Sequence, residues 1–108
     1  MNDNERDIIR VTGPMYDPPH PGGFIARTYM AELGLSARRL AAMLGVAPTT
    51  VTRVVAGNAR VTPDLAVRLE KVLGRTAESW LRMQEAYDLW QARRTVDTSA
   101  LERIPVLA

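Results

Sequence analysis

The spacing of small and apolar residues between positions 41 and 54 constrains the fold of this chain more than any other feature. Ala41 is followed by Gly45, and Val51 and Val54 come after that glycine. A small residue lets two helices approach closely, glycine allows a tight turn between them, and the valines fill the angle that the helices enclose. Together these positions predict a helix-turn-helix over about residues 36–56.

Residues that begin and end helices recur along the chain and predict five helices. Serine or threonine accepts hydrogen bonds from the free amides of a first turn, proline suits a first helical position, and glycine ends a helix. The predicted helices are residues 23–33, 37–44, 48–56, 63–73 and 77–94. With no internal strand expected, the fold class is all-α, with an irregular extension at residues 1–20, a helical domain at 21–94 and a tail at 95–108.

The third predicted helix has two different sides. On a helical wheel, Val51 and Val54 lie on one side, and Thr49, Thr52 and Arg53 lie on the other. A recognition helix inserts its first turns into the major groove of DNA, where short threonines permit close approach and Arg53 can reach O6 and N7 of guanine. The alternatives are that the threonines only stabilise the first turn and that Arg53 contacts phosphate or is surface filler.

Basic residues are concentrated in the middle of the chain. Residues 20–75 contain eight bases and three acids, whereas residues 1–19 and 76–108 each contain more acids than bases. Polar and basic side chains beside a reading helix are expected to bind phosphate, which orients a protein on DNA without reading its sequence. Thr49 is one candidate for this role, and a solvated surface is the alternative for the arginines. The other candidates are Ser36, Arg38, Arg39, Thr50, Asn58 and Arg60.

The composition excludes several classes of function. There is no cysteine, and the sole histidine, His20, is expected to cap or precede a helix, so cysteine–histidine catalysis and the usual zinc sites are excluded. Four acids are expected at solvated helical positions: Asp64, Glu70, Glu85 and Asp88. We therefore predict no enzymatic activity, no cofactor and no metal. No apolar run reaches the ~20 residues of a membrane span, and the polar start is unlike a secretory signal, which predicts a cytoplasmic protein.

The last predicted helix has more apolar surface than one packed face requires. A wide stripe on it contains Trp80, Met83, Gln84, Tyr87 and Trp90. Spare apolar surface indicates a partner, and one reading helix covers only a few base pairs. We therefore expect a homodimer that forms through this stripe and binds two half-sites. The alternative is that the tail folds back and covers the stripe within one chain.

Several stretches around the helix-turn-helix resemble those of a known family. The Xre/Cro-type motif, His20-Pro21-Gly22, and the segments VTPDLAVRL (61–69), ESWLRMQ (78–84) and YDLW (87–90) are together similar to HigA-family antitoxins over about residues 20–98. The resemblance implies a lambda-repressor-like fold and a dimer that binds operator DNA and represses its own operon. It also implies a second partner, a RelE-like, mRNA-cleaving toxin of the HigB type, and base reading by Thr49, Thr52 and Arg53.

The chain departs from that family in two places. Many members have a basic turn such as Asn-Gly-Lys after the recognition helix, whereas residues 56–58 here are Ala-Gly-Asn, which leaves Arg60 as a substitute phosphate contact. The extension before the first helix is longer than usual, and Ile8, Ile9 and Val11 are a hypothesis for docking on a sheet edge of the toxin. Two other functions stay open: a stand-alone or phage-type repressor without a toxin, and a protein-interaction module that has lost DNA binding.

Overall fold

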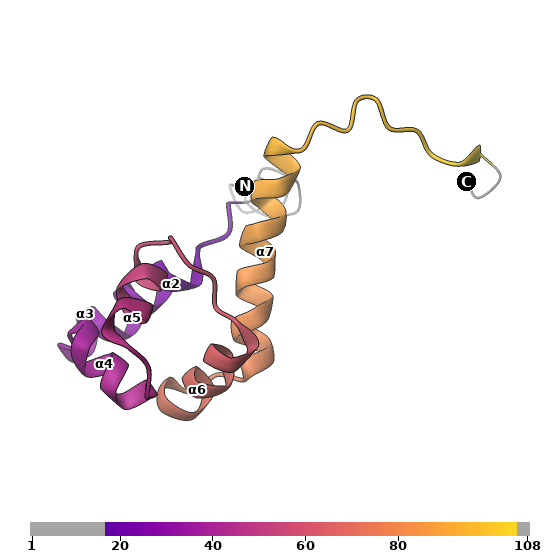
Figure 1. The fold of residues 1–108 in the computed structure, drawn as a ribbon. Coiled ribbons are helices and arrows are strands. Elements are labelled where there is room, and N and C mark those ends of the chain that lie inside the picture. The colour runs from indigo at the N-terminus through magenta and orange to yellow at the C-terminus, as the bar shows by residue number, and fades with distance from the viewer. Residues whose placement is uncertain (1–16, 106–108) are drawn as a thin grey trace, which may run out of the picture.

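The computed structural model describes residues 17–105, which form helices and connections without a strand. Figure 1 shows a ring of short helices closed by one long helix, with a tail leaving its far end. The predictions for Ile8, Ile9 and Val11 lie outside the described residues. Among the helices of this part of the chain, none has the length and apolar character needed to cross a membrane.

The first helix is continuous but changes its winding, as α2 (Pro21–Ile25), η1 (Ala26–Met30) and α3 (Ala31–Leu33). It begins two residues before the predicted start because Nδ1 of His20 accepts a hydrogen bond from the Gly22 amide at 2.9 Å, as expected of a capping residue. The wider π turn of η1 was not predicted. Gly34, at a φ of 66°, ends the helix where expected.

The other four helices are α4 (Ala37–Leu44), α5 (Pro48–Val55), α6 (Pro63–Leu73) and α7 (Ala77–Thr95). The hydroxyls of Ser36, Thr62 and Thr76 cap α4, α6 and α7, each accepting from an amide three residues later at 3.0–3.2 Å. α4 and α6 have the predicted bounds, while α5 ends one residue earlier and α7 one residue later than predicted. The all-α, five-helix fold is therefore confirmed for the described residues.

The core lies where the short helices meet the first half of α7. α7 packs against α6 and α2, and α4 packs against α5 and α6. At the centre Trp80 is completely buried, its indole Nε1 donates to the Gly74 carbonyl at 3.0 Å, and the rings of Phe24 and Tyr29 pack against it. The first half of α7 thus belongs to the body of the molecule.

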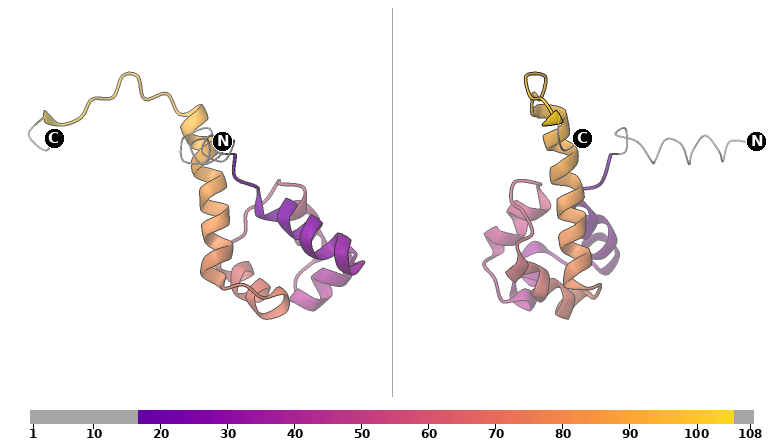
Figure 2. Two further views of the ribbon diagram at one scale, coloured as in Figure 1. Left: turned by 180° about the vertical axis from the view of Figure 1, so that it is seen from behind. Right: turned by 90° about the vertical axis from the view of Figure 1, so that its right-hand side faces the viewer.

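The tail after α7 extends away from the body, as the left view in Figure 2 shows. Its apolar side chains Val96, Leu101 and Ile104 are 59%, 71% and 59% exposed. Within residues 96–105 the tail does not fold back, so the alternative in which it covers the stripe of α7 is wrong for this segment.

Candidate nucleic-acid interface

α4 and α5 form the helix-turn-helix that the residue spacing predicted. Ala41, Val51 and Val54 are 0%, 4% and 3% exposed, and all lie in the core. Gly45 adopts a left-handed φ of 73° at the turn, a conformation that side chains rarely take. The geometry that fixes the angle between the two helices is therefore confirmed.

The turn is also held by an arginine from outside the motif, which the sequence did not reveal. Arg68 on α6 donates from Nη1 to the carbonyls of Leu44, at 2.9 Å, and Gly45, at 3.3 Å. Its Nε donates to the carboxylate of Asp64 at 2.6 Å. Since the last carbonyls of a helix lack partners within it, Arg68 satisfies the end of α4.

A second contact that the sequence did not reveal fixes the inner side of α5. α2 crosses α5 at Gly22, where an added Cβ would lie 1.8 Å from the Val54 carbonyl oxygen and 2.9 Å from the Cα of Val55. Only glycine permits this approach without moving one helix. Gly22 therefore sets the position of α5 from the side opposite its exposed face.

The exposed face of α5 carries the residues that were predicted to read bases. Thr49, Thr52 and Arg53 are all exposed, and the Thr52 hydroxyl donates to the Thr49 carbonyl at 3.1 Å. Among residues 17–105 no acid forms an ion pair with Arg53. The orientation expected from the helical wheel is confirmed, while base contact by these three residues stays a prediction.

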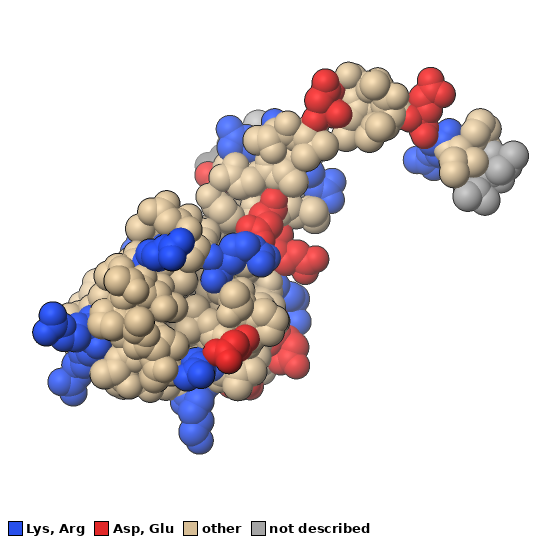
Figure 3. All heavy atoms as spheres, in the orientation of Figure 1, with Lys and Arg blue, Asp and Glu red and all other residues tan. Residues whose placement is uncertain are grey.

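The candidates for phosphate contact come from α4, α5 and the segments next to these helices. Ser36, Arg38, Arg39 and Asn58 are exposed, and Thr50 is half-buried. The Ser36 hydroxyl accepts from the Arg39 amide, and its own proton remains available to donate to a phosphate. In Figure 3, lysine and arginine side chains occupy the left and lower margins of the body, and most visible acids lie toward α7 and the tail.

Arg60 differs from the other candidates because it has an acidic partner. Its Nε donates to Oδ2 of Asp88 on α7 at 2.8 Å, and its Nη2 lies 2.5 Å from the same oxygen. The side chains of Arg60 and Asp88 are 62% and 35% exposed. The expectation that Asp88 is a solvated acid is therefore wrong, because it is half-buried and paired with a residue 28 positions away.

A groove joins the reading helix to the loop that follows it. It has a volume of about 440 Å³, and both Arg53 of α5 and Arg60 of the loop line it, together with Thr50. Asp64, an acid at the same groove, is paired with Arg68. The groove therefore places two guanidinium groups from different elements on one side of the molecule.

The predicted dimer stripe on α7 must be corrected for two of its five residues. Trp80 and Gln84 are 0% and 1% exposed and are used inside the chain, so neither is available to a second copy. Met83, Tyr87 and Trp90 are half-buried. Helical periodicity placed the five residues on one stripe, but it did not show that α2, α6 and the loop before α6 would cover its first part.

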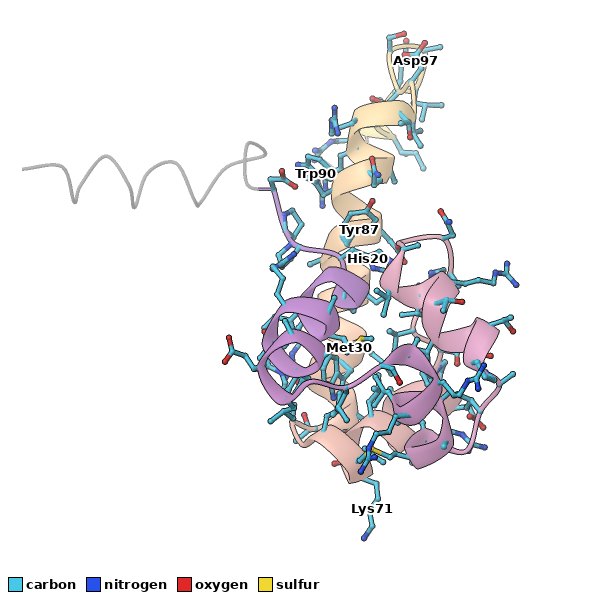
Figure 4. All side chains as sticks on the ribbon, turned by 90° about the vertical axis from the view of Figure 1, so that its left-hand side faces the viewer. His20, Met30, Lys71, Tyr87, Trp90 and Asp97 are labelled. Carbon is cyan, nitrogen blue, oxygen red and sulfur yellow. The ribbon has the colours of Figure 1, made fainter. Side chains whose placement is uncertain are left out.

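His20 lies against the middle of α7, where Figure 4 shows it beside Tyr87. The two rings meet edge to face with centroids 4.9 Å apart. Burial lowers the pKa of His20 below its usual value, and the negative charge of Asp88 acts in the opposite direction. Among the described residues, no group of three or more potential ligands could hold a metal ion.

Comparison with known proteins agrees with this geometry. The chain matches the helix-turn-helix family HTH_3 over residues 27–81. It is 38% identical over 90 residues to the uncharacterised HTH-type transcriptional regulator YddM of Escherichia coli K12, which is 83% of this chain and 95% of that protein. It is 31% identical over 83 residues to antitoxin HigA-1 of Vibrio cholerae, covering 77% of this chain and 78% of that protein.

Solved structures of similar proteins share the helical arrangement over most of this chain. The antitoxin GraA superposes with a TM-score of 0.76 at 36% identity, covering 81% of this chain and 97% of that one. The Pseudomonas aeruginosa antitoxin HigA, solved with the higBA promoter, gives a TM-score of 0.74 at 28% identity, covering 81% and 95%. The structure of this similar protein therefore includes promoter DNA.

Proposed function

Since this chain belongs to the HigA family of helix-turn-helix antitoxins, we propose that it represses its own operon as a dimer and neutralises a RelE-like, mRNA-cleaving toxin of the HigB type. α5 is the reading helix in this proposal. Thr49, Thr52 and Arg53 contact bases, and the polar and basic side chains around them contact phosphates.

The observation that carries the DNA-binding part is the contrast between the two sides of α5. Its inner side is fixed by Val51, Val54 and the crossing of Gly22. Its outer side presents Thr49, Thr52 and Arg53 in exposed positions. A rigidly placed helix with short side chains and one arginine at its exposed face suits insertion into a major groove.

The dimer in this proposal uses the part of the α7 stripe that is not fully buried, most of which lies in the second half of the helix. After the correction above, the candidate contact consists of Met83, Tyr87 and Trp90, with Leu89 nearby at 43% exposure. Figure 4 shows Trp90 on the part of α7 that projects beyond the short helices. A dimer formed there leaves the α5 faces of both copies available, as two half-sites require.

The toxin part of the proposal rests on the family to which the chain belongs. Its test is co-expression with the reading frame next to this gene, where a family toxin is expected. The chain should restore growth that the neighbouring product arrests, and Arg53→Ala should restore it equally well, because α5 reads DNA and does not bind the toxin. Failure of the wild type to restore growth would leave a stand-alone repressor.

The DNA part is tested with a duplex that carries the sequence upstream of this gene. Arg53→Ala should weaken binding by about 5- to 150-fold, since a bidentate guanine contact contributes roughly 1–3 kcal/mol of discrimination. Arg82→Ala is the matched control, because it removes the same charge from an exposed position on α7, beside a different groove. Equal losses in both variants, or an affinity that does not fall with salt, would contradict the proposal.

A further inference from the structure

A buried amide on α7 holds the loop that follows the reading helix. Gln84 is 1% exposed, and its Oε1 accepts a hydrogen bond from the Val61 amide at 2.8 Å. Val61 is itself 1% exposed, so its amide has no access to water. A buried backbone amide is costly without a partner, and Gln84 therefore fixes the end of the loop at residues 56–62.

The same glutamine extends to the ion pair described above. Nε2 of Gln84 donates to Oδ1 of Asp88 at 3.0 Å, while Oδ2 of Asp88 accepts from Arg60. Both oxygens of the Asp88 carboxylate therefore accept hydrogen bonds, one from Gln84 on the same helix and the other from Arg60 in the loop before α6. The chain of contacts runs from the Val61 amide through Gln84 and Asp88 to the guanidinium of Arg60.

This arrangement fixes the orientation of Arg60 at the groove that it shares with Arg53. Asp88 takes the Nε and Nη2 edge of the guanidinium, which leaves Nη1 for another acceptor. The Arg60 side chain as a whole remains 62% exposed despite this pairing. An arginine held along one edge loses less conformational freedom when its other end binds a phosphate.

We propose that Gln84 and Asp88 are positioning residues for DNA binding, which hold Arg60 from α7 so that it meets a phosphate beside the bases read by α5. This inference rests on the proposed function. It assigns a position to Arg60, which takes the place of the basic residue that many family members carry in the turn after the recognition helix. It also links the DNA-binding face to α7, whose second half contains most of the proposed dimer contact.

The test compares Asp88→Asn with Glu85→Gln on the upstream duplex, at several salt concentrations. Each variant removes one negative charge from α7, but Glu85 is exposed and outside the Gln84–Asp88–Arg60 contacts. Removing an acid by itself favours binding to DNA, and Glu85→Gln should bind as well as the wild type or better. Asp88→Asn should bind about three- to tenfold more weakly, and its salt slope should fall by about one ion, as for loss of a phosphate contact.

Arg60 variants show whether Asp88 acts through the arginine. Arg60→Gln should lower the affinity for the duplex and its salt slope as Asp88→Asn does. The double variant should bind the duplex no more weakly than Arg60→Gln alone. Arg60→Lys, an exposed substitution that leaves the core intact, should also weaken binding, because an ammonium cannot replace the guanidinium fork.

The outcomes separate this inference from the function on which it rests. If the wild-type chain does not bind the duplex, the proposed function and this inference both fail. If the wild type binds and Asp88→Asn behaves like Glu85→Gln, or weakens binding without changing the salt slope, this inference alone is overturned. An additive loss in the double variant overturns it too.

Discussion

The two halves of α7 differ in what covers them. The first half contributes Trp80 and Gln84 to the interior, where α2, α6 and the loop before α6 enclose them. The second half projects beyond the short helices and leads into a tail whose apolar side chains are exposed. One helix therefore serves as a core element at one end and as an available surface at the other. We therefore expect stability to depend mainly on the first half of α7, and the proposed dimer contact to lie mainly on the second.

The sharpest way to break this comparison is to truncate one tryptophan from each half. Trp80→Ala should destabilise the chain by about 4 kcal/mol, because it removes a completely buried ring together with its hydrogen bond to the Gly74 carbonyl. Trp90→Ala should cost about 1 kcal/mol or less, because Trp90 is half-buried. Urea unfolding of the dilute protein measures the loss of stability in each variant. Equal losses would contradict the view that only the first half of α7 is a core element.

The crossing of α2 over α5 belongs to the same well-covered region. Gly22→Ala should cost about 3 kcal/mol, because the new Cβ would overlap the Val54 carbonyl and neither backbone can yield locally. Gly23→Ala is the matched control, since its Cβ would meet only the flexible end of Arg27, at 3.0 Å. Helix propensity alone favours alanine at both positions. Thermal unfolding should therefore show a large loss at position 22 alone, and the same loss at position 23 would show that the crossing is not responsible.

Gln84 sharpens the comparison at the boundary between the halves. Gln84→Leu keeps the approximate shape of the side chain but leaves the buried Val61 amide without an acceptor, which should cost about 2 kcal/mol. In Gln84→Leu, hydrogen exchange at the Val61 amide should accelerate more, relative to the wild type, than exchange at the core amides of α4. Unchanged protection of the Val61 amide would mean that another acceptor replaces Gln84.

His20 adds a pH dependence to the well-covered region. Its folded-state pKa is lowered by burial, with Asp88 opposing, so the unfolded chain binds the proton more readily. The stabilisation is therefore present above the unfolded pKa of about 6.5 and is lost as the pH falls through the lower folded value. The urea midpoint should fall between pH 7.5 and pH 5 in the wild type and fall less in His20→Asn, which retains a capping acceptor. The same fall in both proteins would assign it to other groups.

The smallest effect is expected in the exposed region. Ending the chain after Asp97 removes the exposed Leu101 and Ile104 and should change the free energy of unfolding of the dilute protein by less than about 0.5 kcal/mol. A loss of unfolding free energy comparable to that of Gln84→Leu would show that the tail stabilises the helical part of the same chain.

Local signals were sufficient to predict most of the helices. Capping by Ser36 and Thr62 and the left-handed glycine at position 45 gave the bounds of α4 and α6 without error. The helical wheel of α5 separated its inner and outer sides correctly, because α4 and α5 are short and pack against each other in the usual helix-turn-helix arrangement. His20 was placed correctly before a helix, although its cap moved the start to Pro21.

Contacts between distant segments could not be predicted in the same way. Nothing near Gly22 shows that another helix crosses there, and nothing near Asp88 indicates Arg60, which lies 28 residues away. The error at Trp80 and Gln84 has the same origin, because an apolar stripe is equally suited to a core and to an interface. What covers a stripe depends on the tertiary arrangement, which one helix does not encode.

Within residues 17–105, the exposed side chains of α5 are not part of the buried core. Thr49, Thr52 and Arg53 can therefore be replaced without moving the valines that anchor the same helix. Under the proposed function, target choice and fold are therefore separately adjustable. A library randomised at these three positions should remain folded while its members bind different operators, and descendants of one ancestral chain could diverge in the promoters they recognise while retaining one scaffold.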